Sequence, residues 1–251
     1  MNRPLARNAY AVRNRVLNRM SATEFDSLSS SLKLVAFERG QLVQQGDAPI
    51  QHVYFVEHGL VSLLVQSTTD LPVEIATIDS TSMVGIEVLV DAPRAIHRAV
   101  VQTPATLALR IEVDAFRAAI EREPSLRRHC AHVSQDLMRQ SAQNLLCNTR
   151  HELEPRLAKW LSLASEPFAA GVVPVTHESL ALALGARRPS ITAALAALES
   201  GGVVLKQRGA LKLPDLPALR ARACSCLPVM LRARGAFSSH STAPYRLTLW
   251  S

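Results

Sequence analysis

The sequence of 251 residues is poor in cysteine and in aromatic residues, which make up only 4% of it. Its four cysteines, at positions 130, 147, 224 and 226, include no CxxC pair. This number and spacing exclude a disulfide framework and a standard zinc ribbon, and they fit a reducing compartment. No stretch approaches the roughly 18 apolar residues of a membrane span, and the arginine-rich first twenty residues lack the apolar core of a secretory signal. We therefore expect a cytoplasmic protein without membrane contact.

Motifs of catalysis are missing as well. The sequence contains no glycine-rich phosphate loop and no GxSxG nucleophile elbow. Its histidines and carboxylates show no spacing that suggests acid–base catalysis. We therefore predict that the protein is not an enzyme, and a metal-dependent enzyme remains only as a rival interpretation of the scattered histidines and cysteines.

Histidine and cysteine approach each other in two places, but neither gives a complete metal site. Cys147 and His151 are four residues apart and fit one face of a helix, yet zinc needs three or four ligands. The segment 129–132 (HCAH) has the same deficiency. Cys224 and Cys226 are interpreted as small residues of a terminal helix or loop, with a redox-active pair as the alternative. The sequence therefore predicts no metal site.

The charge is distributed unevenly along the chain. Residues 1–149 carry 15 basic and 15 acidic side chains, whereas residues 150–251 carry 13 basic and 6 acidic ones. The whole net charge of +7 therefore lies in the second part. A cationic domain attracts polyanions, of which nucleic acid is the commonest soluble example, although a basic surface can also serve solubility alone.

The first part of the chain reads as a small β domain behind a short helix. Ser21 and Glu24 form a capping box that starts a helix reaching about residue 30. Seven short runs rich in Val, Ile and Leu then follow between residues 32 and 111, separated by Gly, Pro and Asp. Short strands at regular spacing are typical of a β-sandwich or barrel.

Residues 124–147 are predicted to form one long helix. Pro124 suits the first helical position, and apolar residues follow at alternating spacings of four and three. This seam consists of Leu126, Cys130, Val133 and Leu137. We expect two copies of the helix to pack along it in a homodimer, and the alternative is that the seam packs on its own β domain.

Residues 174–213 predict a winged helix-turn-helix. Thr176 can cap a helix that carries Glu178 in its first turn and ends at Gly185, and Pro189 then begins a second helix. The buried stripe of this second helix is Ile191, Ala194, Leu195 and Leu198. Its outer side is small enough to enter a major groove. Two short strands after it form a wing whose exposed cations are Lys206, Arg208 and Lys212, and such side chains commonly meet phosphates.

This order of elements resembles the Crp/Fnr family of bacterial transcription regulators. Three segments carry the resemblance: residues 52–62 (HVYFVEHGLVS), 85–87 (GIE) and 184–192 (LGARRPSIT). The resemblance covers about residues 20–226 and implies a homodimer that binds a palindromic operator in double-stranded DNA, together with RNA polymerase if the protein is an activator. It implies an α+β fold with an N-terminal antiparallel, jelly-roll-like β-roll, a long dimerisation helix and a C-terminal winged helix-turn-helix.

Carried over by position, Arg188 corresponds to the family's arginine that reads a guanine edge. The DNA-contacting set implied in this way is Thr176, Arg187, Arg188, Pro189, Ser190 and Thr192, with Lys206 and Arg208 added from the wing. The family often has Glu in place of Pro189 and a second Arg in place of Ala193. We therefore expect an operator different from that of the catabolite activator.

In family members that bind a cyclic nucleotide, a Gly-Glu-Leu stretch contacts the ribose and an Arg-Ser pair holds the phosphate. Here an isoleucine separates Gly85 from Glu87, and His97 and Arg98 stand at the place of the pair, with Arg94 nearby. We therefore expect an altered or lost cyclic-nucleotide site. No cysteine precedes Cys130, so the N-terminal iron–sulfur cluster of the oxygen-sensing branch is not expected either.

The resulting division has five parts. They are an N-terminal extension (1–20), the β-roll (21–122), the dimerisation helix (123–148), the winged helix-turn-helix domain (149–226) and a flexible tail (227–251). The alternative function is a cyclic-nucleotide-responsive module that acts on a protein partner. It leaves the cationic second part of the chain without a purpose.

Overall fold

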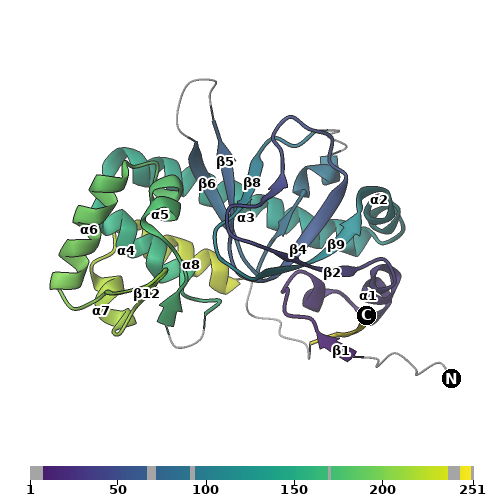
Figure 1. Ribbon diagram of the computed structural model, residues 1–251. Coiled ribbons are helices and arrows are strands. Elements are labelled where there is room, and N and C mark those ends of the chain that lie inside the picture. The colour runs from purple at the N-terminus through teal and green to yellow at the C-terminus, as the bar shows by residue number, and fades with distance from the viewer. Residues whose placement is uncertain (1–7, 67–71, 91–93, 169–170, 237–243, 250–251) are drawn as a thin grey trace.

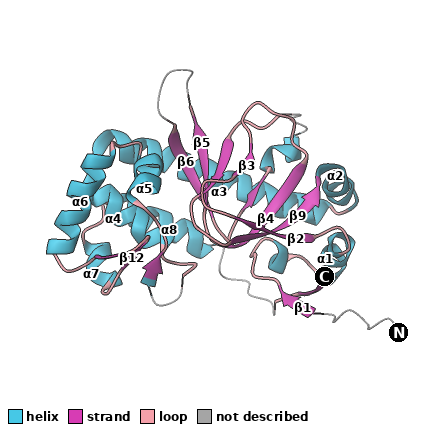
Figure 2. Cartoon of the chain, in the orientation of Figure 1, coloured by secondary structure: helices cyan, strands magenta, loops and turns pink. Residues whose placement is uncertain are grey.

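The computed structural model describes residues 8–66, 72–90, 94–168, 171–236 and 244–249. Figure 1 shows a β-rich lobe and a helical lobe, joined by the long helix α3 (Pro124–Arg150). The order of secondary structure, with strands concentrated in the first lobe and helices in the second, is clear in Figure 2. This is the α+β arrangement that the sequence predicts.

Two four-stranded antiparallel sheets form the β-roll. One has the strand order β2-β9-β4-β7 and the other the order β3-β8-β5-β6. The strands are β2 (Lys33–Phe37), β3 (Leu42–Gln44), β4 (His52–His58), β5 (Val61–Val65), β6 (Val73–Ile78), β7 (Met83–Val84), β8 (Arg98–Val101) and β9 (Thr106–Glu112). Seven of them coincide with the predicted apolar runs to within two residues at each end. The sequence analysis missed only β7, which is two residues long.

Close packing at Gly59 explains one of the turn signals in the roll. Gly59 follows β4 with φ +92°, and a Cβ atom there would collide with the hydroxyl groups of Thr103 and Thr106. The Thr103 hydroxyl accepts a hydrogen bond from the backbone N–H of Leu60 at 2.9 Å. Only glycine combines this backbone conformation with so little space.

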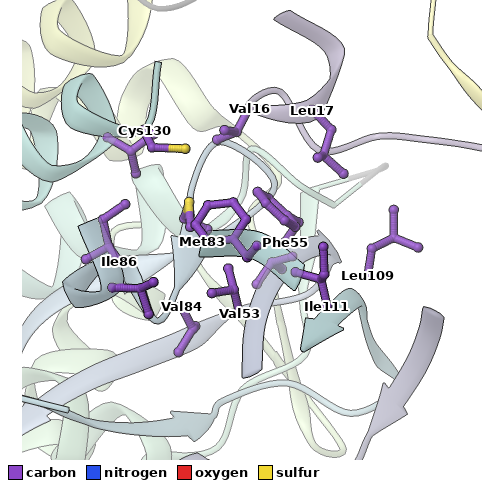
Figure 3. Packing of buried hydrophobic residues seen from close by; sticks show 14 of the residues in the cluster. Val16, Leu17, Val53, Phe55, Met83, Val84, Ile86, Leu109, Ile111 and Cys130 are labelled. Carbon is purple, nitrogen blue, oxygen red and sulfur yellow. The ribbon is translucent and has the colours of Figure 1, made fainter. Parts of the chain in front are cut away.

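Short helices precede, interrupt and follow the strands of the roll. They are η1 (Leu17–Arg19), α1 (Ala22–Ser29), η2 (Ile86–Val90) and α2 (Val113–Arg122). The capping box of Ser21 and Glu24 at the start of α1 is present, as predicted. Figure 3 shows the core between these elements, where Phe55 and Met83 from the sheet lie close to Val16 and to Cys130 of α3.

The helical lobe contains the predicted winged helix-turn-helix. Its helices are α4 (Leu153–Ala164), α5 (His177–Leu184), α6 (Arg188–Ser200) and α7 (Leu216–Ala221). Its sheet has the order β10-β12-β11, with β10 (Val172–Val173), β11 (Leu205–Gln207) and β12 (Ala210–Lys212). Leu180 and Leu184 of α5 and the expected stripe of α6 form its core with Leu157 and Leu161 of α4.

The C-terminal segment differs from the flexible tail expected at 227–251. Helix α8 (Cys226–Ala236) packs Leu227 and Met230 on Leu163. Arg234 is only 12% exposed and forms ion pairs with Asp79 of the roll at 3.2 Å and with Glu166 at 3.0 Å. The tail interpretation is therefore wrong for this helix; residues 237–243 and 250–251 lie outside the described residues.

The two ends of the described chain also pair with each other. β13 (Arg246–Leu249) runs antiparallel to β1 (Asn8–Ala11), which belongs to the expected N-terminal extension. Tyr245 stacks on Phe25 with ring centroids 4.2 Å apart. Sequence periodicity cannot reveal this pairing, because its partners are more than 230 residues apart.

Within the described residues, no helix combines the length and the apolar character that a bilayer crossing requires.

Candidate nucleic-acid interface

Helix α5 is built as its sequence predicts. The Thr176 hydroxyl accepts a hydrogen bond from the backbone N–H of Ser179 at 3.1 Å, and the Ser179 hydroxyl accepts one from Thr176 N–H at 2.9 Å. This reciprocal capping satisfies N–H groups that a helix start leaves free. The helix ends at Gly185, whose φ of +57° turns the chain towards α6. Thr176 is half-buried, and its hydroxyl is already engaged by the cap.

Helix α6 turns a buried stripe inward and leaves its N-terminus exposed. Its buried residues are Ile191, Ala194, Leu195 and Leu198, as predicted. Arg187, Arg188, Pro189 and Ser190 are all exposed. Among the described residues, neither arginine has an acidic partner. Figure 1 shows α6 on the side of the helical lobe that faces away from the β-roll. The predicted recognition segment is therefore accessible to a duplex.

All three predicted wing cations, Lys206, Arg208 and Lys212, are exposed, but Lys206 and Arg208 differ in their surroundings. Lys206 on β11 forms an ion pair with Glu199 of α6, with 2.7 Å between Nζ and Oε2. Its hydrogen bond lowers the pKa of the exposed Glu199 carboxyl. Arg208 lies exposed at the turn between β11 and β12 and has no such partner in the described part of the chain. Arg208 is thus free to meet a phosphate, whereas Lys206 must first leave Glu199.

His177 belongs to this surface and was missed by the sequence analysis. Its Nδ1 lies 3.1 Å from the Thr192 hydroxyl, which also donates to the Arg188 carbonyl oxygen at 3.1 Å. Burial lowers the pKa of His177, and the neighbouring cations Lys206 and Arg188 lower it further. A surface hollow lies between α5, the start of α6 and the wing, and His177 and Arg188 line it together. His177 and Arg188 come together only when α5, α6 and the wing pack against one another, so no local sequence signal could have identified His177.

The candidate effector residues lie in two groups. Glu87 is buried in η2, where its carboxylate accepts a hydrogen bond from the Ile96 N–H at 3.2 Å and meets His97 Nδ1 at 3.2 Å. Burial would raise the pKa of Glu87, but the hydrogen bonds outweigh it and leave the pKa below its usual value. Gly85, with φ +91°, starts this turn. The structure thus brings Gly85, Glu87 and His97 together.

Among the described residues, neither of the two candidate phosphate-binding arginines pairs with Glu87. Arg94 donates a hydrogen bond to the carbonyl oxygen of Asp47 and pairs with its carboxylate at 3.9 Å. Arg98 begins β8 and is exposed. Within the described part of the chain, the partners of Glu87 are the Ile96 N–H and His97. The carboxylate is satisfied by neighbours within the roll.

The predicted dimer seam is buried within its own chain. Leu126, Cys130, Val133 and Leu137 are at most 7% exposed and belong to the core of the β-roll. They leave no surface for a second copy, so the alternative interpretation, packing on the chain's own β domain, describes this face. The 3–4 spacing identifies an apolar face but not what covers it, and here the sheets lie against it.

A second face of α3, next to the buried seam, is exposed to solvent. Met138 and Leu145 are 73% and 68% exposed, and they are seven residues apart. Ala131, Gln135 and Ala142 are also exposed and complete a row at spacings of four and three. Leu146, 48% exposed, lies beside it. An exposed row with this spacing is typical of a helix that pairs with another helix.

Four potential metal ligands gather where α3 meets α4. They are Cys147, His151, Cys224 and Cys226. From the sequence each pair was considered separately and no metal site was predicted, because neither pair supplies the three or four ligands that zinc needs. His151 and Cys224 are 73 positions apart in the sequence.

Comparisons with known proteins agree with this architecture. A family model of the cyclic nucleotide-binding domain matches residues 34–123, and one of the Crp-like helix-turn-helix domain matches residues 155–222. No protein of curated function matches the sequence. Among solved structures, FixK2 from Bradyrhizobium japonicum has a TM-score of 0.67 at 16% identity, with 77% of this chain and 98% of that chain covered.

Two further structures have the same fold. A CRP-family transcriptional regulator from Thermus thermophilus has a TM-score of 0.64 at 24% identity, covering 77% of this chain and 98% of that one. The c-di-GMP responsive regulator CLP from Xanthomonas campestris has a TM-score of 0.62 at 14% identity, covering 78% of this chain and 100% of that one.

A cyclic-nucleotide-binding-type β-roll joined by one long helix to a winged helix-turn-helix defines a class of transcription regulators. The two family models together match more than half of the chain, in the order that this class requires. The chain therefore has the two domains of the Crp/Fnr family of transcription regulators, in the same order.

Proposed function

We propose that the protein binds a palindromic operator in double-stranded DNA as a homodimer and regulates transcription from it. The observation that carries this proposal is the exposed, unpaired start of α6, where Arg187 and Arg188 stand on the cationic domain. A helix N-terminus with two free guanidinium groups can enter a major groove about 12 Å wide, and arginine pairs bidentately with guanine. Arg208 supports it as a phosphate contact from the wing.

The exposed face of α3 supplies the homodimer in this proposal. Two copies packed along Met138 and Leu145 would remove both large apolar side chains from water. In this proposal the two α6 helices of the dimer enter successive major grooves, which lie ~34 Å apart. RNA polymerase is a further partner if the protein activates transcription. Because its proposed ligand is DNA, we expect the protein to act in the cytoplasm.

The β-roll has, in this proposal, an altered or lost cyclic-nucleotide site. Glu87 is the acidic residue nearest to the family's ribose contact, and it is occupied by His97 and by the Ile96 N–H. A ribose would have to displace both hydrogen bonds, which a buried carboxylate resists. We therefore expect the roll to bind cyclic AMP weakly or not at all.

The alternative, a regulatory module acting on a protein partner, is separated by one titration. Fluorescently labelled random duplex DNA should bind the full chain at low salt, and its affinity should fall steeply as salt rises, because bound cations release counterions from DNA. Selection from a random duplex pool should then enrich a two-fold symmetric sequence. Absence of binding at low salt would refute the proposal, and an enriched sequence without symmetry would refute the homodimer.

A further inference from the structure

Three cysteines and one histidine from distant parts of the sequence meet beside the junction of α3 and α4. Cys147 lies in the last turn of α3, and His151 caps the C-terminus of that helix. Cys224 lies between α7 and α8, and Cys226 is the first residue of α8. One ligand atom from each of them, three sulfurs and one ring nitrogen, lies within 4.8 Å of all the others. All three cysteines are buried and His151 is half-buried.

The distances within this group match a tetrahedral metal site. Cys147 Sγ lies 3.5 Å from Cys224 Sγ, and Cys226 Sγ lies 3.5 Å from His151 Nδ1. A tetrahedral zinc ion with Zn–S of about 2.3 Å and Zn–N of about 2.0 Å separates its ligand atoms by roughly 3.5–3.8 Å. The two measured separations share no atom, so they correspond to opposite edges of such a tetrahedron.

The local backbone holds the ligands at this spacing. Cys147 and His151 are one helical turn apart, and the His151 N–H donates to the Cys147 carbonyl oxygen at 3.1 Å. Cys224 N–H donates to the Pro155 carbonyl oxygen at 3.2 Å, and Leu227 N–H donates to the Cys224 carbonyl oxygen at 3.0 Å. These bonds tie both ligand pairs to the junction independently of any metal, so the site is largely formed by the fold itself.

The cysteines do not serve either hydrophobic core. Cys147, Cys224 and Cys226 form a separate cluster with one another, apart from the cores of the roll and of the winged domain. The Cys147–Cys224 separation of 3.5 Å also exceeds the S–S bond length of about 2.05 Å, so the structure holds them as free thiols. Buried thiols that meet an imidazole instead of a core are suited to bind a soft or borderline cation.

The charge around the group is suited to the same purpose. Three thiolates and a neutral imidazole around Zn²⁺ leave a net charge of −1, which is costly to bury without compensation. Lys159 is buried, at 4% exposure, and its ammonium group interacts electrostatically with Cys147. Its Nζ also donates to Asn144 Oδ1 at 2.9 Å, which fixes it in place.

We propose that Cys147, His151, Cys224 and Cys226 bind one Zn²⁺ ion as a structural Cys₃His site. The site lies outside both matched domains, because the first family model ends at residue 123 and the second covers 155–222. Its ligands come from the end of the inter-domain helix and from the segment leading into α8. The ion therefore fixes the C-terminal helix to the junction between the two domains.

The metal content of untagged protein, purified with a reductant and without chelator, tests this site. Mass spectrometry of the elements should give about one zinc per chain. Cys224→Ser and Cys226→Ser should each lower the affinity for zinc at least about tenfold, since even mutations outside the ligand set change metal affinity by 10–100-fold. The zinc content of both variants should fall as a result. Cys130→Ala is the matched control, because Cys130 is buried in the roll core, and it should keep the zinc.

Cobalt substitution keeps the proposal testable if a cysteine variant fails to fold. The wild-type protein loaded with Co²⁺ should show thiolate-to-cobalt charge transfer and the strong visible bands of a tetrahedral ion. Purified protein that contains no zinc and shows no such spectrum after Co²⁺ is added would overturn the proposal. Zinc retained by both the Cys224→Ser and the Cys226→Ser variant would overturn it as well. A Cys147–Cys224 disulfide in freshly purified protein, found by peptide mass mapping, would also overturn it in favour of a redox pair.

Discussion

The β-roll and the winged domain use their charged side chains in opposite ways. In the roll, the candidate carboxylate faces inward: Glu87 is buried and meets His97. In the winged domain, Arg187 and Arg188 face outward and have no acidic partner in the described part of the chain. Polar groups that are already satisfied have little to gain from a ligand, whereas free guanidinium groups gain both charge and hydrogen bonds from DNA. The winged domain therefore has charged groups available to bind a ligand, whereas Glu87 of the roll already has its partners within the chain.

A dimer-breaking variant tests whether the winged domain acts as one of a pair, and it has the largest expected effect. Met138→Glu combined with Leu145→Glu places two charges on the exposed face of α3. The protein should sediment as a monomer, and its affinity for a full palindrome should fall by ~10²–10⁴, because the second half-site is no longer bound at high effective concentration. Affinity for a single half-site should stay unchanged.

The matched control for this variant is Leu42→Glu, which charges an exposed apolar residue of β3 in the roll, 42% exposed. It should remain dimeric. A double variant that sediments like the wild type would show that another surface makes the dimer.

Features that depend on neighbouring residues could be predicted from the sequence in both domains. Local signals were sufficient for the winged domain: the Thr176 cap, the left-handed Gly185 and the apolar stripe of α6 are all read within a few residues, and all are present. The same holds for most strands of the roll. Here the alternation of apolar residues and the turn glycines mark each strand.

What sequence could not reveal depends on contacts between distant residues. The seam of α3 was predicted with correct spacing but assigned to the wrong neighbour, since periodicity does not say whether a sheet or a second helix covers a face. Arg234, which joins Asp79 to Glu166, lies in a segment without periodicity. The cysteine–histidine group escaped for the same reason, because each pair is incomplete until the fold brings them together.

Arg188→Ala sharpens the comparison at the level of single base pairs. A bidentate contact with guanine discriminates by ~1–3 kcal/mol, so its removal should lower affinity for the selected operator by that amount per half-site and relax the preference at one position of each half-site. Competition with operators substituted at each position measures this loss. An unchanged base preference at every position would show that Arg188 does not read the sequence.

The wing gives a smaller effect that is independent of sequence. Arg208→Ala should weaken all duplexes alike and reduce the slope of log affinity against log salt by about one for each bound copy of the chain. Lys206→Ala should change the slope less, because Lys206 is paired with Glu199 at 2.7 Å. Glu199→Gln is the matched variant: by freeing Lys206 it should strengthen binding to every duplex. Equal slopes for Arg208→Ala and the wild type would remove the wing from the interface.

The smallest effect is expected in the roll, where the comparison predicts almost no response to a nucleotide. A ligand at 100 times its Kd stabilises a protein by about 2.7 kcal/mol, which raises Tm by several degrees in a chain of this size. Cyclic AMP at millimolar concentration should leave Tm unchanged, because Glu87 keeps its bonds to His97 and the Ile96 N–H. Operator DNA in the same assay should raise Tm and so serves as the positive control. A rise of several degrees with micromolar cyclic AMP would mean that a ribose displaces these bonds, and the roll would then be as open to a partner as the winged domain.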